Sequence, residues 1–584
     1  MSMPAWLPGL ADTLRRQAAD LVARHDLPGM VVGVVAGDDP DDALAWSQAF
    51  GWGGGPSSAE GGARALDADT LFRVASITKT FTATAVVQLR DQGRLRLDDP
   101  LVKHVPEFAA VVNPFGSIED VTLRRVASHS SGLMGEPPTD HWSTLRFPTR
   151  EEWLAVLPQV RIAIPPGSAF KYSNLGYTLL GEVIERISGK PYAEFMREAI
   201  FEPLGMVSSA YELTEELRSR AAPGHMPHPF EDGAEPALPS PLGGMAAAGQ
   251  LWTTARDLSR WISVHFRTDV AERGGRQILA GPSMTEMQQA SFVEPSWAGG
   301  YGFGWRILRR GERVYHGHGG SVPGYRSQIF FEASLKVGMI VLIDGVGPAD
   351  QVAVELMDTL AEHVQEAEAA RPPAAPRPTP PEYRRFLGLY RMLRVGDLPA
   401  RVEYRDGTLR LKDAAVSPFP GGLPTILEPT DNPLVFMVRN GRYAGEPLTF
   451  GVAEDGSVAG FRAAGFSFVH LLEAAPPTAS HPDLVHEAID DELWASIQSL
   501  DGMELHTAAD GAAFTIHRGS GDAIQVTPES TGRPRLVTWA EFSRALAIGR
   551  PVERLTATVV HATGTQNASY IVAILQELRR RGKL

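Results

Sequence analysis

The residues of this chain best suited to chemistry are a serine and a lysine three positions apart, Ser76 and Lys79. A serine hydroxyl is a poor nucleophile until a nearby base takes its proton. A lysine amine can serve as that base when burial or a neighbouring positive charge lowers its pKa toward neutrality. Because residues three apart lie on one face of a helix, the pair predicts a nucleophilic serine with its base one turn away.

The segment that must position this pair, residues 77–93, is predicted to be a helix. Its apolar residues recur at every fourth position, and Gly93 provides a stop. The first N–H groups of a helix have no partner within it and attract negative charge. We therefore expect the nucleophile, the base and part of an oxyanion hole to come from one turn of the chain.

A second serine, Ser168, has a lysine at the same spacing, Lys171, so the spacing alone does not identify the nucleophile. Ser168 follows a Pro-Pro-Gly run, and no helical apolar repeat follows Lys171. These features are typical of a loop. The context therefore favours Ser76.

A second candidate group is the run Tyr172-Ser173-Asn174, where a polar loop leads into an amphipathic helix. A tyrosine held near a lysine can ionise more easily and act as a general base, and an asparagine amide can hold a substrate carbonyl. The structural alternative is a helix start in which Asn174 is the cap and Tyr172 packs against the core.

A third group is a glycine-rich run over residues 316–325, which begins with His316 and His318. Consecutive glycines let another chain approach the backbone closely, as an oxyanion hole requires. A metal site is the alternative, because residues two apart on a strand share a face. No third ligand stands nearby in the sequence, so we expect no metal. The run continues as Gly319-Gly320-Ser321.

Two spacers rich in proline, residues 371–381 and 474–482, divide the chain into three predicted domains. Residues 1–370 form the first predicted domain, which ends in a helix over residues 349–370. Residues 382–473 contain short alternating strands with two Asp-Gly turns, which predicts a small antiparallel barrel or sandwich.

The last domain, residues 483–584, is predicted to be a small α+β domain whose function stays open. We expect strands over 514–517, 524–527 and 555–560 and helices over 539–546 and from 567. Basic residues at 579–581 are typical of a helix C-terminus, although nucleic-acid binding is an alternative. The triplet that begins at His517 has the same His-x-Gly pattern as the one that begins at His318, but it lacks the glycine-rich sequence around it.

Composition excludes several classes of function. The chain has 584 residues and no cysteine, which removes disulfides, thiolate catalysis and cysteine-based metal sites. A formal charge of −14 disfavours nucleic acid and anionic membranes as partners. Residues 1–25 lack the pattern of a signal peptide and indicate an amphipathic helix over 11–25, and no segment is apolar enough to span a bilayer. We expect a cytoplasmic protein.

Together the motifs resemble those of the serine β-lactamase and penicillin-binding-protein superfamily. The resemblance covers roughly residues 10–364 and is strongest to class C β-lactamases, D-aminopeptidases, D-alanyl-D-alanine carboxypeptidases and family VIII esterases. It implies an α/β (α+β) domain with an antiparallel sheet flanked by helices and a helical region. The barrel segment resembles lipocalin-like domains that border the active site in some D-aminopeptidase-like members. The matching motifs are FRVASITKTFTATAVVQL, VTLRRVASHSSGL, PPGSAFKYSNLGYTLLGEVIE, GGMAAAGQLWTTARDLSRW, YGFGW and HGHGGSVPGY.

The resemblance assigns roles to these residues. Ser76 would form an acyl-enzyme, Lys79 would assist its deprotonation, and Tyr172 would act first as general base and then as general acid. Asn174 would orient the substrate. The backbone N–H groups of Ser76 and Ser321 would form the oxyanion hole, beside Gly319 and Gly320, with no cofactor.

His318 departs from the pattern of true β-lactamases, which usually have lysine there. Histidine is only partly charged near pH 7 and is the residue that esterase, D-aminopeptidase and carboxypeptidase-like members use. We therefore expect hydrolysis of a small ester or amide, including D-amino-acid amides and short D-peptides, ahead of β-lactam hydrolysis.

Three alternatives stay open: acyl transfer to an amine, as in a transpeptidase or peptide ligase; a β-lactamase; and a catalytically silent binding or sensor protein. Hydrolysis and acyl transfer differ only in whether water or an amine reaches the acyl-enzyme. Retention of Ser76, Lys79, Tyr172 and Asn174 argues against lost catalysis. The expected partner is a small-molecule ester, amide or short peptide, and association into a homo-oligomer stays open.

Overall fold

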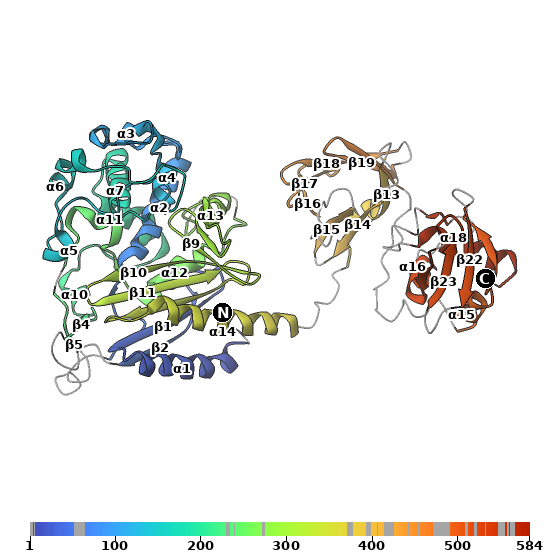
Figure 1. The fold of residues 1–584 in the computed structure, drawn as a ribbon, viewed down its shortest axis with the longest axis horizontal. Helices are drawn as coiled ribbons and strands as arrows, with labels where there is room; N and C mark the ends of the chain where they lie inside the picture. Colours follow the sequence, from blue (N-terminus) through green and yellow to red (C-terminus); the bar gives the residue numbers. More distant parts are fainter. Residues whose placement is uncertain are drawn as a thin grey trace. The chain divides into compact units, whose positions relative to one another are not determined.

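The structure is a computed structural model, which divides into two compact units, Met1–Arg371 and Pro372–Leu584. It describes the chain apart from residues 1–3, 5, 52–64, 229–233, 239, 271–274, 371–377, 393–398, 406, 414–424, 442, 454–455, 471–490, 508–511, 519–522, 532, 547–554, 558–559, 561–566 and 584. Each part is described separately (Figure 1). None of the helices in the described part combines the length and the apolarity that crossing a bilayer requires.

The first unit is built on an antiparallel sheet of eight strands in the order β2-β1-β12-β11-β10-β9-β8-β7. The first two strands of the chain therefore lie beside the last strand of this unit. The bounds are β1 (Gly29–Ala36), β2 (Leu44–Gly51), β7 (Phe292–Val293), β8 (Gly299–Tyr301), β9 (Arg306–Arg310), β10 (Arg313–Val322), β11 (Tyr325–Glu332) and β12 (Val337–Ile343).

Helices cover both faces of this sheet. Helices α1 (Leu7–Arg24) and α14 (Ala349–Ala370) pack together on one face, and α12 (Ala255–Val264) packs on the other (Figure 1). Because both faces are covered, central strands such as β1 and β12 are buried at nearly every residue instead of alternating apolar and polar residues. The antiparallel sheet flanked by helices is confirmed.

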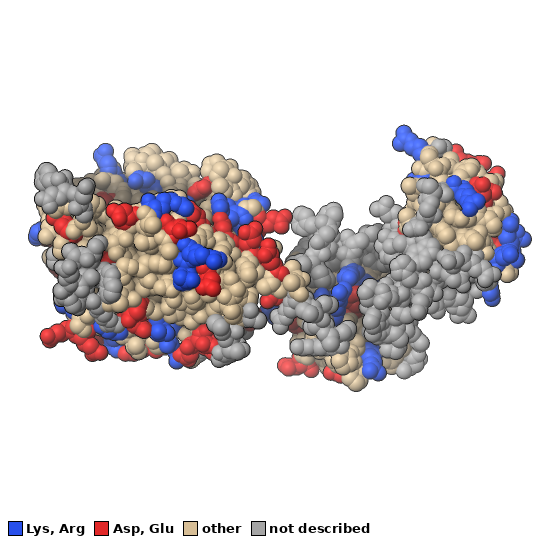
Figure 2. All heavy atoms as spheres, turned by 90° about the horizontal axis from the view of Figure 1, so that it is seen from below, with Lys and Arg blue, Asp and Glu red and all other residues tan. Residues whose placement is uncertain are grey.

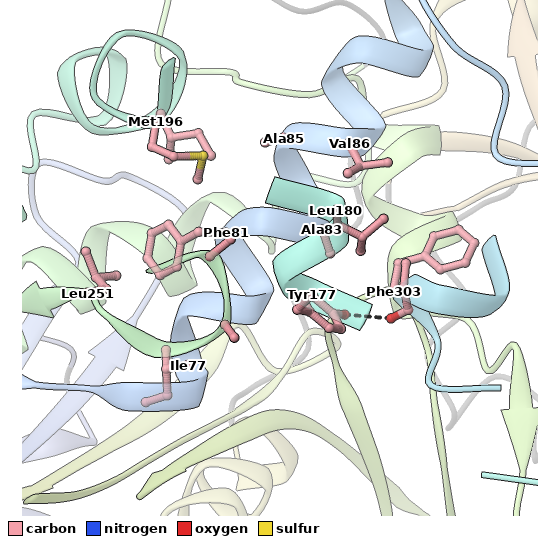
Figure 3. Close-up of a cluster of buried hydrophobic side chains, with 14 of the residues drawn as sticks. Ile77, Phe81, Ala83, Ala85, Val86, Tyr177, Leu180, Met196, Leu251 and Phe303 are labelled. Atoms are coloured by element: carbon pink, nitrogen blue, oxygen red, sulfur yellow. Dashed lines mark hydrogen bonds between the residues drawn. The ribbon is translucent and has the colours of Figure 1, made fainter. Parts of the chain in front are cut away.

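A helical region inserted between β2 and β7 holds the segment that opens with Ser76. Helix α2 (Thr78–Asp91) runs through its interior, buried from Thr78 to Leu89, against α7 (Asn174–Ser188) and α11 (Ala246–Gly249). Figure 3 shows side chains of α2 packed among apolar residues of its neighbours. The smaller helices here are α3 (Leu101–His104), α4 (Leu123–Ala127), α5 (His141–Thr144), α6 (Arg150–Ala155), α8 (Tyr192–Met196), α9 (Glu202–Leu204), α10 (Glu215–Arg218) and α13 (Gly281–Gln288).

The structure defines the starts of the two helices at the candidate site. The helix expected from residue 77 begins as a 3-10 turn, η2 (Ala75–Ile77), before α2, and ends with Gly93 in the left-handed conformation at φ 71°. Helix α7 has Ser173 as its cap, because the Ser173 hydroxyl accepts the Gly176 N–H at 2.8 Å. Asn174 is therefore not the cap, and its amide is free to face another group.

The second unit contains an eight-stranded closed antiparallel barrel, which confirms the predicted barrel. Aromatic side chains such as Phe386, Phe450 and Phe461 fill its interior. The aspartates of the two predicted Asp-Gly turns lie outside the described residues. The glycines of these turns, Gly407 and Gly456, have left-handed backbone conformations. The strands are β13 (Gly388–Met392), β14 (Pro399–Arg405), β15 (Thr408–Asp413), β16 (Thr425–Pro429), β17 (Val435–Val438), β18 (Pro447–Val452), β19 (Val458–Ala463) and β20 (Phe466–His470).

The end of the chain forms a four-stranded antiparallel sheet with its own apolar core. The strand expected over residues 555–560 is wrong where that segment is described: Ala557 and Val560 are helical, and the Val560 N–H donates to the Thr556 carbonyl at 3.0 Å. The elements are α15 (Asp491–Gln498), β21 (Glu504–His506), β22 (Ala513–Arg518), β23 (Ala523–Pro528), β24 (Arg535–Thr538), α16 (Trp539–Leu546) and α18 (Ala568–Arg580).

Charged side chains are mixed on the face of the first unit seen in Figure 2, where acidic and basic residues alternate without a broad patch of one sign. At the end of α18, Arg580 and the following Arg581 both pair with Glu577, and Gly582 follows with φ 67°. These contacts give that basic run a local structural role, as expected at a helix end.

Candidate active site

Ser76 lies in the tight η2 turn that joins strand β3 (Phe72–Arg73) to helix α2. Ala75 just before it has φ 46°, a left-handed conformation that is uncommon for a residue with a Cβ. Strand β10 approaches this turn so closely that a Cβ on Gly320 would lie 2.1 Å from the Val74 carbonyl oxygen. The glycine-rich run therefore serves the close backbone approach that its sequence predicted.

Lys79 is fully buried and makes three polar contacts through Nζ. It donates to Ser76 Oγ at 3.0 Å, to Asn174 Oδ1 at 2.7 Å and to the Ala248 carbonyl at 2.6 Å. Burial lowers the pKa of the Lys79 ammonium to about 7, while the negative charge of Glu136 opposes that shift. Near neutral pH a large share of Lys79 is therefore a neutral amine able to take the Ser76 proton.

Tyr172 lies beside the same pair, with the Lys79 Nζ 4.9 Å from the centre of its ring. The expectation that Lys79 eases the ionisation of this tyrosine needs correction. Burial raises the pKa of the Tyr172 hydroxyl, although its hydrogen bond with Ser76 acts in the opposite direction. In the free protein Tyr172 is thus a neutral phenol that can donate a proton, whereas the lowered pKa of Lys79 lets its amine accept one near neutral pH.

A polar chain extends from Lys79 through residues that the motifs did not single out. The Asn174 amide accepts from Lys79 and donates to Glu136, and the other Glu136 oxygen lies 3.2 Å from His141 Nε2. Because Glu136 can only accept from the amide, it fixes which way Asn174 points. Glu136 lies three residues beyond the VTLRRVASHSSGL motif, which is the one signal the sequence offered for it.

His318 is neutral in this structure. Its Nδ1 lies 2.7 Å from the Gly319 carbonyl, so Nδ1 carries the proton, and burial together with the nearby Lys79 lowers its pKa to about 3. The expectation of partial charge near pH 7 is therefore corrected to no charge. His316 bonds to the Gln288 carbonyl at 3.0 Å, and the described residues contain no cluster of three acidic or histidine ligands that could hold a metal.

Two cavities lie at the candidate site, one lined by Tyr172 and the other by Ser76. The larger, about 310 Å³, is lined by Tyr172, His318 and Gly319 together with the aromatic rings of Phe170, Phe292 and Tyr301 and the charged Glu294 and Arg306. The smaller, about 30 Å³, is lined by both Ser76 and Ser321, the two residues expected to form the oxyanion hole. Asn174 and the apolar side chains of Trp142, Phe147, Leu242 and Met245 also line it.

The competing candidates lie elsewhere. Ser168 is exposed in a turn, where its hydroxyl donates to the Pro165 carbonyl at 2.7 Å. His517 is exposed on β22 of the second unit. Within the first unit, the structure brings the predicted residues together around Ser76 and leaves Ser168 outside this group.

The sequence of the first unit matches a known family model. Residues 14–362, more than half of the chain, match the model described as Beta-lactamase. This chain belongs to the β-lactamase family. The match places it within the serine β-lactamase and penicillin-binding-protein superfamily.

Two curated members of this superfamily are similar in sequence to this chain. Penicillin-binding protein 4 of Amycolatopsis lactamdurans is 30% identical over 54% of this chain and 83% of its own length. The D-alanyl-D-alanine-carboxypeptidase/endopeptidase AmpH of Escherichia coli is 32% identical over 41% of this chain and 60% of its own length. The octameric penicillin-binding protein homologue from Pyrococcus abyssi covers 79% of this chain and 99% of its own, with 22% identity and a TM-score of 0.52, which supports the fold.

Proposed function

We propose that this β-lactamase-family protein is a serine hydrolase that cleaves small amides or esters through an acyl-enzyme on Ser76. The observation that carries the proposal is the buried Lys79 amine 3.0 Å from the Ser76 hydroxyl, with its pKa lowered to about 7. A nucleophile with a base poised near the working pH is the arrangement that nucleophilic catalysis needs.

The groups around Ser76 support each step in turn. Ser76 Oγ would attack the substrate carbonyl carbon while its proton passes to Lys79 Nζ. The oxyanion would form at the smaller cavity, between Ser76 and Ser321. As the bond to the leaving nitrogen or oxygen breaks, Tyr172 would give that atom a proton and regain one from Lys79. Water would then attack the acyl-enzyme, and its proton would return to Ser76.

The leaving group would occupy the larger cavity, because Tyr172, its proposed proton donor, borders that cavity. The three aromatic rings favour an apolar or aromatic group. The exposed Arg306 shares this cavity with Glu294 but makes no ion pair with a carboxylate among the described residues, so it is open to a substrate anion. Short D-peptides with a free carboxylate fit both features, and AmpH is a relative whose name states carboxypeptidase activity.

The lack of charge on His318 bears on which substrates the site prefers. A β-lactamase that relies on a fixed cation for the substrate carboxylate gains nothing from an uncharged imidazole at this position. We therefore place amides, esters and short D-peptides ahead of β-lactams. Transfer of the acyl group to an amine remains the second candidate, because the larger cavity that releases one amine can also admit another.

The test is labelling with a fluorophosphonate, followed by peptide mass spectrometry and assays on p-nitrophenyl esters, D-amino-acid anilides, D-dipeptides and nitrocefin. We expect the adduct on Ser76 and a loss of several orders of magnitude in turnover for Ser76→Ala. Ser168→Ala is the matched control and should keep normal activity. An adduct on Ser168, or near-normal turnover by Ser76→Ala, would contradict the proposal; added amine acceptors would reveal acyl transfer in the products.

A further inference from the structure

His129 is a fully buried histidine that none of the proposed chemical steps uses. It follows helix α4 and has φ 54°, a left-handed conformation that brings its ring and its carbonyl toward the same neighbouring segment. Its ring is surrounded by aromatic rings of three other elements or loops, with ring centres 4.3 to 5.6 Å away. These are Phe170, Tyr172, Tyr177 and Tyr301.

The segment that His129 holds is the one that carries Tyr172. The His129 carbonyl accepts the Lys171 N–H at 2.7 Å, and His129 Nδ1 accepts the Ser173 N–H at 3.1 Å. Between these two bonds the His129 ring lies against the Tyr172 ring, with centres 4.3 Å apart and planes inclined by 32°. His129 thus contacts the ring of Tyr172 and holds the backbone of the residues on either side of it.

The hydrogen bond to Ser173 defines the state of the ring. A backbone N–H can only donate, so Nδ1 must be unprotonated, and the proton of the neutral ring lies on Nε2. Burial lowers the pKa of His129 well below its usual value, and the charge of Lys79 and the nearby His318 act in the same direction. Tyr172, Tyr177 and Tyr301 are the other titratable groups packed against it.

From this geometry we infer that His129 is a positioning residue, which holds the Tyr172 hydroxyl at Ser76 so that Tyr172 can protonate the leaving group. The inference rests on the proposed function. A displacement of about 1 Å in a catalytic group can cost on the order of 100-fold in rate. The effect should fall on the step that Tyr172 serves and spare substrate binding.

Leaving groups of different basicity separate this role from a general loss of structure. A p-nitrophenolate leaves without a proton, whereas an amine leaves only after protonation. We expect His129→Phe, which keeps a ring and loses the acceptor for Ser173, to lower kcat on a D-amino-acid amide or D-dipeptide by roughly 10- to 100-fold. On the p-nitrophenyl ester the loss should be no more than about threefold, with KM unchanged on both substrates.

A second variant tests the hydrogen bond directly. In His129→Asn the amide Oδ1 takes the place of Nδ1, and asparagine tolerates a left-handed backbone. It should therefore recover part of the amide turnover that His129→Phe loses. His265→Phe is the matched control, because His265 is also fully buried among aromatic rings but packs against Trp261, Trp305 and Phe331. It should show no difference between amide and ester.

The double variant decides the assignment. If His129 acts through Tyr172, then His129→Phe combined with Tyr172→Phe should be no slower on amides than Tyr172→Phe alone. The inference would be overturned if the losses of amide turnover in the two single variants multiplied in the double variant. Equal losses of turnover on ester and amide, or a rise in KM, would also overturn it. Should His129→Phe fail to fold, the same comparison is made with His129→Asn and Tyr172→Phe, and the same outcomes support or overturn the inference. Absence of a Ser76 adduct in the wild type would instead defeat the proposed function itself.

Discussion

Lys79 Nζ lies 3.0 Å from Ser76 Oγ and is completely removed from solvent. The cost of burying the ammonium lowers its pKa to about 7, so the same burial that closes the site also prepares the base. Most of the testable consequences of the structure follow from this pair and from the groups that surround it.

The rate of Ser76 acylation should depend on the protonation of Lys79. Lys79 is a base only after losing its proton, so the rate of fluorophosphonate labelling should rise about tenfold per pH unit below pH 7 and level off above it. A rate that is flat between pH 5 and pH 9, or that rises only near pH 10, would remove Lys79 from this role.

Burial of Lys79 should also reduce the stability of the folded protein near neutral pH. Its folded pKa of about 7 lies below the ordinary value of 10.5, so between these values the unfolded chain binds the extra proton and stability rises with pH. Lys79→Met should be more stable than the wild type at pH 7, by roughly 1–3 kcal/mol, and the gap should narrow by pH 10. Thermal unfolding at both pH values measures this; a gap that widens would contradict it.

Removal of the Glu136 charge should shift the pH dependence in a defined direction. Glu136 raises the pKa of Lys79, so Glu136→Gln, which keeps an acceptor for the Asn174 amide, should move the midpoint of the labelling profile downward by roughly half a unit to one unit. Glu152→Gln is the control, because Glu152 pairs with Arg146 at the surface and should leave the midpoint unchanged.

Gly320 should tolerate no side chain. The Cβ of Gly320→Ala would lie 2.1 Å from the Val74 carbonyl oxygen, which would separate β10 from the Ser76 turn. We expect activity to fall at least about 100-fold and stability to fall by about 1–3 kcal/mol. Gly9→Ala in helix α1, where a Cβ meets nothing within 4 Å, should be neutral or slightly stabilising. Normal turnover by Gly320→Ala would show that the close approach is not required.

Arg306 should select substrates with a free carboxylate. Arg306→Met is expected to lower kcat/KM for D-dipeptides by about 10- to 100-fold and to leave the corresponding D-dipeptide amides within about threefold. Arg309→Met is the neighbour control on β9, because Arg309 bonds instead to the Gly311 carbonyl. Equal losses on acids and amides would indicate that Arg306 only supports the wall of the larger cavity.

The sequence alone determined the family-level fold and predicted Ser76 and Lys79 as the candidate reacting pair. Helical periodicity predicted Ser76 and Lys79 on one turn, and the alternating strands predicted the barrel. The antiparallel sheet of the first unit was expected from the resemblance to the superfamily. These features are local, since contacts three or four residues apart and the alternation of a strand are written in consecutive residues. The same locality explains the error at residues 555–560, where a run rich in β-branched residues is helical where it is described.

Only the tertiary structure decided the state of each group. Asn174 and Ala248, 95 and 169 residues beyond Lys79, complete its hydrogen bonds. Burial lowered the pKa of Lys79, kept Tyr172 protonated and left His318 without charge. A pKa depends on desolvation and on charges brought close by folding, which no spacing of residues along the chain encodes. For that reason the sequence could predict Ser76 and its partners, while the pKa directions on which the proposed roles of Lys79 and Tyr172 rest come from their packing.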